Sequence, residues 1–375
     1  MQGTSYLCYP ASLGLNFTYN SIMGLPITGQ NYNLVSMAFY LGFLVWEFPT
    51  VYIAQKMRIA KYLGVNTVAW GVVLMLHSVG TSFGAFFALR FILGMLESCV
   101  APLLILLICM FYKKNEQATR ISWFYVMNGL TQIFGGFISY GISFYPGSIL
   151  APYQIIYIVL GGLAIMVGIS ILIWLPDSPV HARMLTAKER IAALERVRDD
   201  QGGTENKKIK RDQVVETLLD IRTWLIVLTV MLTSIPNGGI SNWIYIATCF
   251  GSALSTIYAY NASNTSGHTK KSTINALTMV TFALGNIIGT EIFPPKDAPD
   301  YIPGKIAIMT LIVIQLGLSF LIRWINLQLN KNKRARIAEL KERYGWTDAD
   351  VEKERERHAF LDLTDKQNPF FVYTA

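Results

Sequence analysis

Charged residues, histidines and cysteines are all scarce in this sequence. Only 15% of its 375 residues are charged, against about 25% in ordinary soluble domains. Its four histidines are isolated from one another, and its four cysteines show no paired spacing. No CxxC, HExxH, GxSxG or phosphate-loop motif is present, and membrane di-iron enzymes need clustered histidines. We therefore expect no enzyme, no catalytic residue, and neither a metal nor a cofactor.

Apolar residues, which make up 52% of the chain, gather in long blocks. Each block can cross a hydrocarbon core of about 30 Å, which needs about 20 helical residues. Because a bilayer offers the backbone no partner outside its own helix, we expect these blocks to be α-helices. The sequence therefore predicts an all-α integral membrane protein, with blocks at 34–54, 63–83, 86–112, 121–145, 153–175, 223–248, 272–293 and 305–326.

The basic residues indicate how these blocks cross the membrane. The connections at 55–61 and 112–120 are basic, whereas those at 82–85 and 145–152 carry no charge. The positive-inside rule places basic connections in the cytoplasm. We therefore expect the C-terminus to be cytoplasmic. The net charge of +8 is dispersed among the spans, so we expect no binding of nucleic acid.

A polar stretch divides the chain into two membrane-embedded parts. The Leu175-Pro176 sequence ends one block, because proline cannot donate a backbone hydrogen bond. Thr186 and Glu189 have the spacing of a capping box and predict a surface helix. We expect the final tail to be solvated, with contact between its basic start and anionic lipid as the alternative. The predicted organisation is a transmembrane half at 1–175, a cytoplasmic linker at 176–222, a shortened transmembrane half at 223–327 and a tail at 328–375.

Three of the charged residues inside the apolar blocks are candidates for the transport site. Arg90 and Glu97 are seven residues apart, about two helical turns, so they point the same way from one helix. Charge within a bilayer is costly and usually faces a water-filled path or a partner. We predict that Arg90 holds an organic anion and Glu97 carries a proton; the alternatives are an interfacial anchor and a structural hydrogen bond. Glu47 is either a second proton-coupling residue or an interfacial partner of Arg58 or Lys61.

Polar amides within the blocks are candidates for the lining of a substrate cavity. Asn128 and Gln132 lie one turn apart, a pattern that suits either a cavity or simple helix packing. Asn237 belongs to a Pro-Asn-Gly-Gly sequence that interrupts a block, and broken helices often lie at binding sites; a hinge is the alternative. Asn286 and Glu291 are weaker candidates.

The order of these features resembles the major facilitator superfamily, and within it the fungal anion:cation symporters of the allantoate permease type. The resemblance implies a two-half helical bundle, a proton-coupled secondary active transporter, and a cargo such as a carboxylate, ureide or vitamin. It also implies a monomer in the plasma membrane, whose partners are protons, the organic anion and the bilayer. The matching strings include Trp46-Glu47-Phe48-Pro49-Thr50, Arg90-Phe91-Ile92-Leu93-Gly94, Leu175-Pro176-Asp177-Ser178-Pro179, Gly285-Asn286-Ile287-Ile288-Gly289 and Asp362-Leu363-Thr364-Asp365.

The chain also departs from this family, because it offers about nine of the twelve spans. Residues 1–24 are too polar for a full first span, and the seventh span, ending near Phe250, is followed directly by residues typical of the end of the tenth. This loss preserves the direction of the later spans, so His268, Lys270 and Lys271 should remain on the cytoplasmic side. The alternative function is a truncated, transport-inactive membrane protein or a sensor.

Overall fold

The computed structural model describes residues 30–80, 82–144, 150–182, 184–198, 208–238, 244–292, 302–359 and 361–374. Within these ranges the regular structure is helical and contains no β-strand. The expected incomplete first span at 1–24 lies outside them. The helices are α2 (Gln30–Lys56), α3 (Ile59–Leu76), α4 (Phe83–Glu97), α5 (Val100–Phe111), α6 (Lys114–Ser143), α7 (Pro152–Trp174), the short 3₁₀ helix η1 (Pro179–His181), α8 (Ala187–Arg198), α9 (Arg211–Leu219), α10 (Ile221–Gly238), α11 (Ile244–Asn264), α12 (His268–Glu291), α13 (Ile302–Tyr344) and α14 (Asp348–Ala359).

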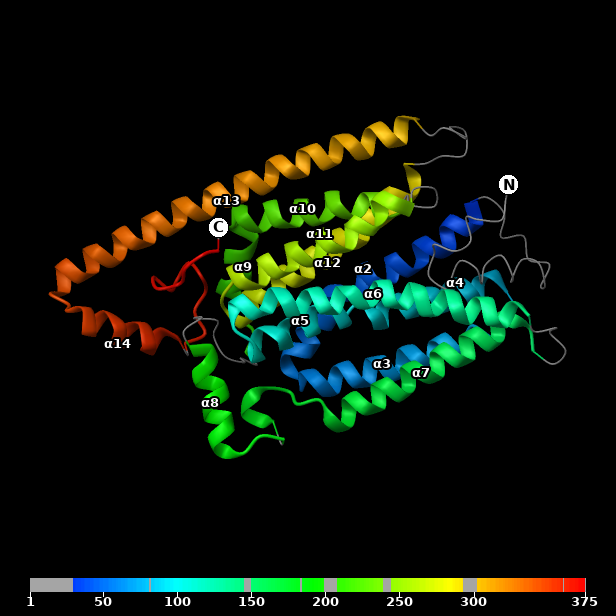
Figure 1. Ribbon diagram of the computed structural model, residues 1–375, viewed down its shortest axis with the longest axis horizontal. Coiled ribbons are helices and arrows are strands. Elements are labelled where there is room, and N and C mark those ends of the chain that lie inside the picture. The colour runs from blue at the N-terminus through cyan, green and yellow to red at the C-terminus, as the bar shows by residue number, and fades with distance from the viewer. Residues whose placement is uncertain are drawn as a thin grey trace.

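The long helices lie roughly side by side along the long axis of the molecule (Figure 1). We call α2 to α7 the N-terminal group and α10 to α13 the C-terminal group. Among the described residues, six helical segments are long and apolar enough to cross a membrane, or seven if α9 and α10, bent by 68°, form one span. Helices α6 and α11 run alongside these segments.

The predicted block at 223–248 is wrong as a single helix. Helix α10 ends at Gly238, and α11 begins at Ile244 and returns toward the end where α10 started. Pro236 and Gly238 explain why α10 ends here, since proline and glycine are the two poorest helix formers. Because α11 returns, Lys270 at the start of α12 lies beside Asp220, which precedes α10. The sequence also predicts that Lys270 lies on the side of the basic connections, because the missing spans leave the direction of the later spans unchanged.

Helices pack closely where glycines face a neighbouring backbone. A Cβ at Gly94 of α4 would overlap the carbonyl oxygen of Phe39, and one at Gly42 of α2 would overlap that of Phe91. Only glycine permits so close an approach of two helices. The crossing fixes α4, which carries Arg90 and Glu97, against α2, which carries Glu47.

One cluster of buried apolar side chains joins the two groups of helices. Protein interiors are densely packed and contain few voids, so buried apolar side chains fit closely against one another. Because its members come from both groups, the cluster holds the two groups together. They are Phe43, Ile105 and Ile121 from the N-terminal group, and Val230, Leu254, Tyr258, Ala259, Ala262, Met279 and Ala283 from the C-terminal group.

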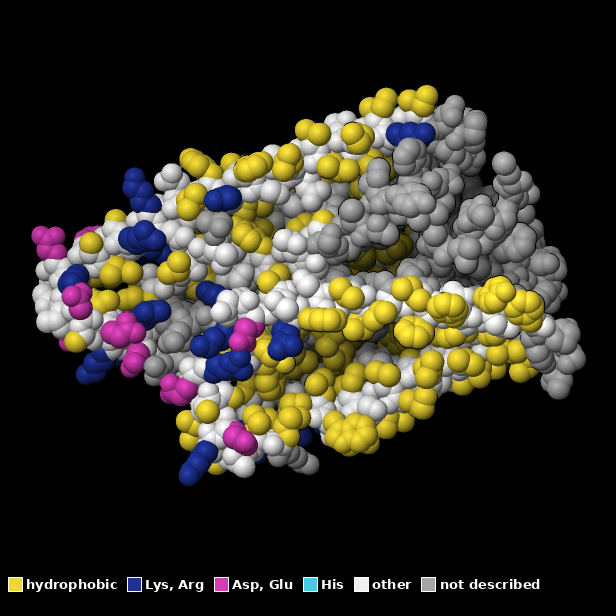
Figure 2. Space-filling view, viewed as in Figure 1, with side chains coloured by type: hydrophobic (Ala, Val, Ile, Leu, Met, Phe, Trp, Pro, Cys, Tyr) yellow, Lys and Arg dark blue, Asp and Glu magenta, His cyan; other side chains and the backbone are white. Residues whose placement is uncertain are grey.

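Charged side chains gather at one end of the molecule, which we call the charged end (Figure 2). Helices α8, α9 and α14 lie there, together with the ends of α2 and α5 (Figure 1). The predicted capping box of α8 is confirmed, because the Glu189 amide donates to Thr186 Oγ1 at 3.4 Å and the Thr186 amide donates to Glu189 Oε2 at 2.7 Å. The basic connections in the described part of the chain all lie at this charged end.

Candidate functional site

Arg90 and Glu97 of α4 both point toward helices of the N-terminal group. Arg90 Nη2 donates to the Tyr157 hydroxyl of α7 at 3.3 Å, and its guanidinium carbon lies 5.2 Å from the centre of the Phe86 ring. Glu97 Oε2 accepts from Trp70 Nε1 of α3 at 3.2 Å. The two charges form no ion pair with each other, although both are described. Arg90 Nε is buried with no hydrogen-bond partner in the described part of the chain.

Glu47 lies at the contact between the two groups. The side chains of Tyr40, Phe43 and Glu47 follow one face of α2, since residues three to four apart are neighbours on a helix. Phe43 packs on Phe282 of α12 with ring centres 6.4 Å apart. The Glu47 carboxylate is near enough to the Tyr258 hydroxyl of α11 for its charge to act on it. Glu47 therefore lies at the contact with the C-terminal group, and its charge also acts on Cys99 of the N-terminal group.

The carboxyl group of Glu47 has no partner among the described residues. Its exposed fraction is 0%, and neither of its oxygens has a hydrogen-bond partner among the described residues. The expected interfacial pairing with Arg58 or Lys61 is wrong; Lys61 instead donates to the carbonyl of Leu172. An isolated buried carboxylate costs far more than a neutral acid. The protonated, neutral form of Glu47 is therefore favoured in this arrangement.

Hydrogen bonds join α2 to α12 on both sides of Glu47. The Tyr40 hydroxyl donates to Asn286 Oδ1 at 3.4 Å. Toward the charged end, Gln55 Nε2 donates to Thr269 Oγ1 at 2.9 Å, and both side chains are buried. The contact between the two groups therefore has polar bonds at its ends and an unpartnered acid between them.

The remaining predicted site residues lie on helices whose side chains are only partly described. Asn128 and Gln132 belong to α6, Asn237 to α10, and Glu291 to α12. Their side chains lie outside the described part of the structure, so their roles stay predictions. Asn286, the other weak candidate, is fully buried and donates to the carbonyl of Phe282 at 2.8 Å.

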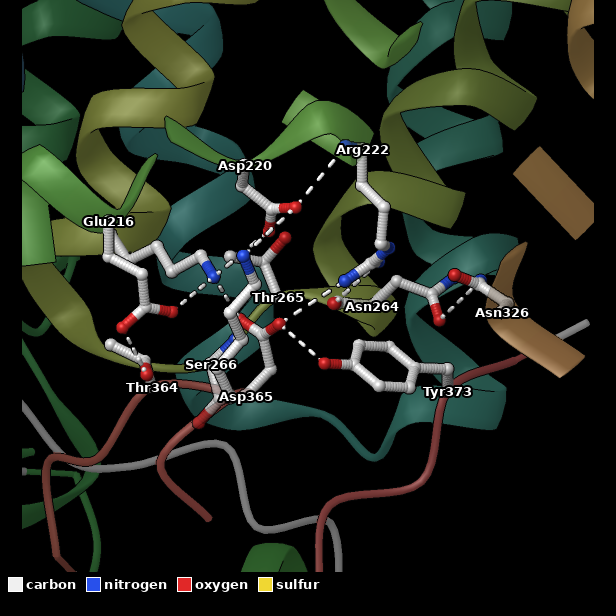
Figure 3. Close-up of polar contacts among 12 residues, drawn as sticks. Glu216, Asp220, Arg222, Asn264, Thr265, Ser266, Asn326, Thr364, Asp365 and Tyr373 are labelled. Atoms are coloured by element: carbon white, nitrogen blue, oxygen red, sulfur yellow. Dashed lines mark hydrogen bonds and ion pairs between the residues drawn. The ribbon is translucent and has the colours of Figure 1, made fainter. Parts of the chain in front are cut away.

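A second polar cluster, at the charged end, surrounds Asp365 (Figure 3). Its carboxylate lies 2.8 Å from Lys270 Nζ and 3.2 Å from Arg222 Nη1, and it accepts from the Tyr373 hydroxyl at 2.8 Å. Burial alone would raise the pKa of Asp365, but the charges of Lys270 and Arg222 hold that pKa below its ordinary value. Glu216 Oε1 also lies 2.7 Å from Lys270 Nζ.

Sequence reasoning missed this cluster. The Asp362-Leu363-Thr364-Asp365 string was noted only as typical of a family, and the tail containing it was expected to be solvated. That expectation is wrong for 361–374, where Asp365 and Phe371 are 0% and 1% exposed. The available signal was the combination of a polar string with three aromatic residues, Phe370, Phe371 and Tyr373. Aromatic side chains of this size rarely stay in water.

Long apolar helices in two groups, with acids buried among them and charges at one end, define a multi-pass membrane transporter. The chain belongs to the Major Facilitator Superfamily, whose sequence profile matches residues 4–329. The resemblance in the sequence is thereby confirmed, as are the helical-bundle fold and the prediction that the chain is not an enzyme.

The chain is similar to several fungal transporters along most of its length. It is 31% identical to an uncharacterized transporter of Schizosaccharomyces pombe, over 95% of this chain and 84% of that protein. It is 28% identical to the allantoate permease of Saccharomyces cerevisiae, over 94% of this chain and 80% of that protein. The first alignment extends over 435 positions, more than the 375 residues of this chain. The relative therefore carries internal residues that this chain lacks, as the missing spans predicted.

The structure also resembles a solved transporter of the same fold. The proton:xylose symporter XylE bound to 6-bromo-6-deoxy-D-glucose superposes with a TM-score of 0.53, over 85% of this chain and 93% of that one. The two sequences are 12% identical, so the likeness shows the fold alone.

Proposed function

We propose that this chain moves a small organic anion together with protons, and that Glu47 takes up and releases the proton. The observation that carries the proposal is the fully buried Glu47 carboxyl, which lies at the contact between the two groups of helices and has no partner among the described residues. In alternating access the two groups move against each other around a site between them. A carboxyl there can be neutral when enclosed and can ionise when water reaches it.

For the cargo we propose a small carboxylate, with a ureide or a vitamin as related possibilities. The allantoate permease to which the chain is similar is named for an organic anion. Arg90 retains an N–H group without a partner among the described residues, so its guanidinium can still bind an anion. Asn128, Gln132 and Asn237 would line the path, and Glu97 would be a second proton-coupling group.

Uptake into liposomes tests the role of Glu47. The full chain is reconstituted, and accumulation of labelled allantoate is measured with and without an inward proton gradient. We expect Glu47→Gln to reduce gradient-driven accumulation to the level seen without a gradient, while exchange of internal for external cargo continues. Glutamine has nearly the same shape as glutamate but cannot carry the proton. Glu342→Gln, an exposed position on α13, is the matched control.

The Glu97→Gln variant shows which of the two acids, Glu47 or Glu97, carries the proton. Glutamine can still accept from Trp70 at this position, so the hydrogen bond to α3 can persist. If Glu97→Gln alone abolishes accumulation and Glu47→Gln accumulates normally, the proton is carried by Glu97 and the role proposed for Glu47 is wrong. If Arg90→Gln leaves the apparent affinity for allantoate unchanged, Arg90 does not bind the anion.

The second candidate is a transport-inactive membrane protein that only binds its ligand. The observation that favours it is the shortness of the chain, since its relative aligns over 435 positions. The excess is large enough for about three spans of about 20 residues each. Binding of allantoate without uptake by the unaltered chain would support this candidate over transport.

We further propose that the chain is monomeric and lies in the plasma membrane with its charged end in the cytoplasm. The gathering of basic connections at that end supports the orientation, because cytoplasmic loops carry an excess of lysine and arginine.

A further inference from the structure

We propose that the C-terminal segment, residues 361–374, is a conformational device that holds the charged end of the transporter closed. This inference depends on the superfamily fold but not on the proposed cargo or on proton coupling. The segment is not helical, yet six of its residues are buried: Thr364, Asp365, Asn368, Phe370, Phe371 and Tyr373. Ordering an extended terminus costs conformational entropy, so these contacts must offset that cost.

Helix α13 presents one row of polar side chains to the segment. Asn326 Nδ2 donates to the carbonyl of Thr374 at 2.8 Å. One turn further on, Asn330 Nδ2 donates to the carbonyl of Tyr373 at 2.8 Å and Asn330 Oδ1 accepts its amide at 2.9 Å. Lys333 Nζ donates to the carbonyls of Asp365 and Asn368. Their spacing places these three side chains on one helix face, so α13 holds the segment along its length.

Asp365 fastens the segment to α10 and α12. It pairs with Arg222 near the start of α10 and with Lys270 in the first turn of α12. Both cations are almost completely buried, with side chains 4% and 2% exposed. Without Asp365, Arg222 would keep its hydrogen bond to the Asn264 carbonyl and its cation–π contact with the Tyr373 ring, but no side-chain carboxylate would pair with its charge in the described structure. Loss of one partner of a buried ion pair is strongly destabilising, so Asp365 is required for the ordered charged end.

The segment also reaches the N-terminal group. Lys114 Nζ, at the first residue of α6, lies 3.7 Å above the centre of the Phe371 ring. At the same end, Gln55 of α2 donates to Thr269, the neighbour of Lys270. The segment thus contacts one group through Phe371 and fixes the position of the other through Asp365. Opening the charged end requires that the Lys114–Phe371 and Gln55–Thr269 contacts separate, and the segment stabilises both.

Hydrogen–deuterium exchange of the full chain in lipid nanodiscs tests this inference without a transported substrate. We expect Asp365→Asn to accelerate exchange roughly a hundredfold in 361–374. Exchange should also rise in the N-terminal group, at the end of α2 around Gln55 and at the start of α6 around Lys114. Asp348→Asn, which removes an exposed acid of α14, is the matched control and should affect α14 alone.

Two results would overturn the inference. If exchange increases only in 361–374 and the C-terminal group, the segment stabilises that group but does not close the end. If no peptide changes, Asp365 does not fasten the segment. Should Asp365→Asn unfold the whole chain, Lys114→Gln decides, because it removes the contact with Phe371 and leaves the buried ion pairs of Asp365 in place. We expect it to accelerate exchange roughly two- to tenfold at the ends of α2 and α6; no change at either place contradicts the inference.

Discussion

Glu47 and Asp365 are both completely buried carboxyl groups, and their surroundings give them different uses. Glu47 has no partner among the described residues, whereas Asp365 contacts Lys270, Arg222 and Tyr373. Protonation of Glu47 breaks no contact and removes a costly charge. Protonation of Asp365 would leave the buried Arg222 guanidinium without an acid, whereas Lys270 would keep Glu216 and Asp220. The first group is therefore suited to proton exchange and the second to holding structure.

The contribution of Asp365 to the docking of the C-terminal segment should be insensitive to pH in the physiological range. The folded-state pKa of Asp365 is depressed below its unfolded value of about 3.9. A depressed carboxyl pKa contributes stability that is complete above the unfolded value and is lost as pH falls through the folded value. The contribution of Asp365 to the protection of 361–374, measured as the difference in protection between the unaltered chain and Asp365→Asn, should thus stay constant from about pH 7 to about pH 5. The charged and titratable groups around Asp365 and the segment include Lys270, Arg222, Lys333, Glu216 and Asp220, and also His268 beside Asp362.

A loss of this difference in protection between about pH 7 and about pH 5 would contradict this account. It would mean that a group with a higher pKa, rather than Asp365, controls docking.

At the scale of helices, the crossing of α2 and α4 shows how a small residue determines the position of a functional side chain. Gly94 lies between Arg90 and Glu97, and its Cα faces the backbone of α2 at Phe39. The close approach brings the helix of Glu47 and the helix of Arg90 and Glu97 into direct contact. Any side chain at position 94 must push them apart.

Gly94→Ala should therefore destabilise the protein by about 1–3 kcal/mol, the usual cost of overpacking. The comparison is Gly84→Ala on the same helix, where an added Cβ has no atom within 4 Å. Alanine is the better helix former by about 1 kcal/mol, so Gly84→Ala should leave stability equal or higher. Thermal unfolding in detergent measures both; equal melting temperatures for the two variants would show that the crossing tolerates a methyl group.

At the scale of the whole molecule, apolar contacts join the two groups, and polar contacts join them at the charged end. The charge distribution also indicates how the molecule is oriented across the membrane. The basic connections share one end with the C-terminal segment, and lysine and arginine are retained on the cytoplasmic side of membranes. The arrangement predicts a cytoplasmic C-terminus.

Protease protection checks this orientation. An epitope tag placed after Ala375 should resist external protease in intact spheroplasts and should be cleaved after permeabilisation. Cleavage of the tag in intact cells would place the charged end outside and would reverse the proposed direction.

The sequence by itself determined the membrane-embedded helices and the end at which charges gather. Both follow from local rules, because a bilayer leaves the backbone no alternative to helices and basic loops determine how the spans are oriented. The capping box at Thr186 and Glu189 was predictable for the same reason, since its partners are three residues apart. The resemblance to a known family was also readable in the sequence, and the family match over residues 4–329 confirmed it.

Only the tertiary structure decided which buried groups have partners. The sequence left Glu47 as either a proton-coupling residue or an interfacial partner of Arg58 or Lys61; in the described structure its carboxyl lies near Tyr258 of α11 and pairs with neither cation. The pairing of Asp365 with Lys270 and Arg222 joins three distant parts of the chain. Periodicity within one segment cannot specify such contacts, because they depend on how helices rotate and pack against one another.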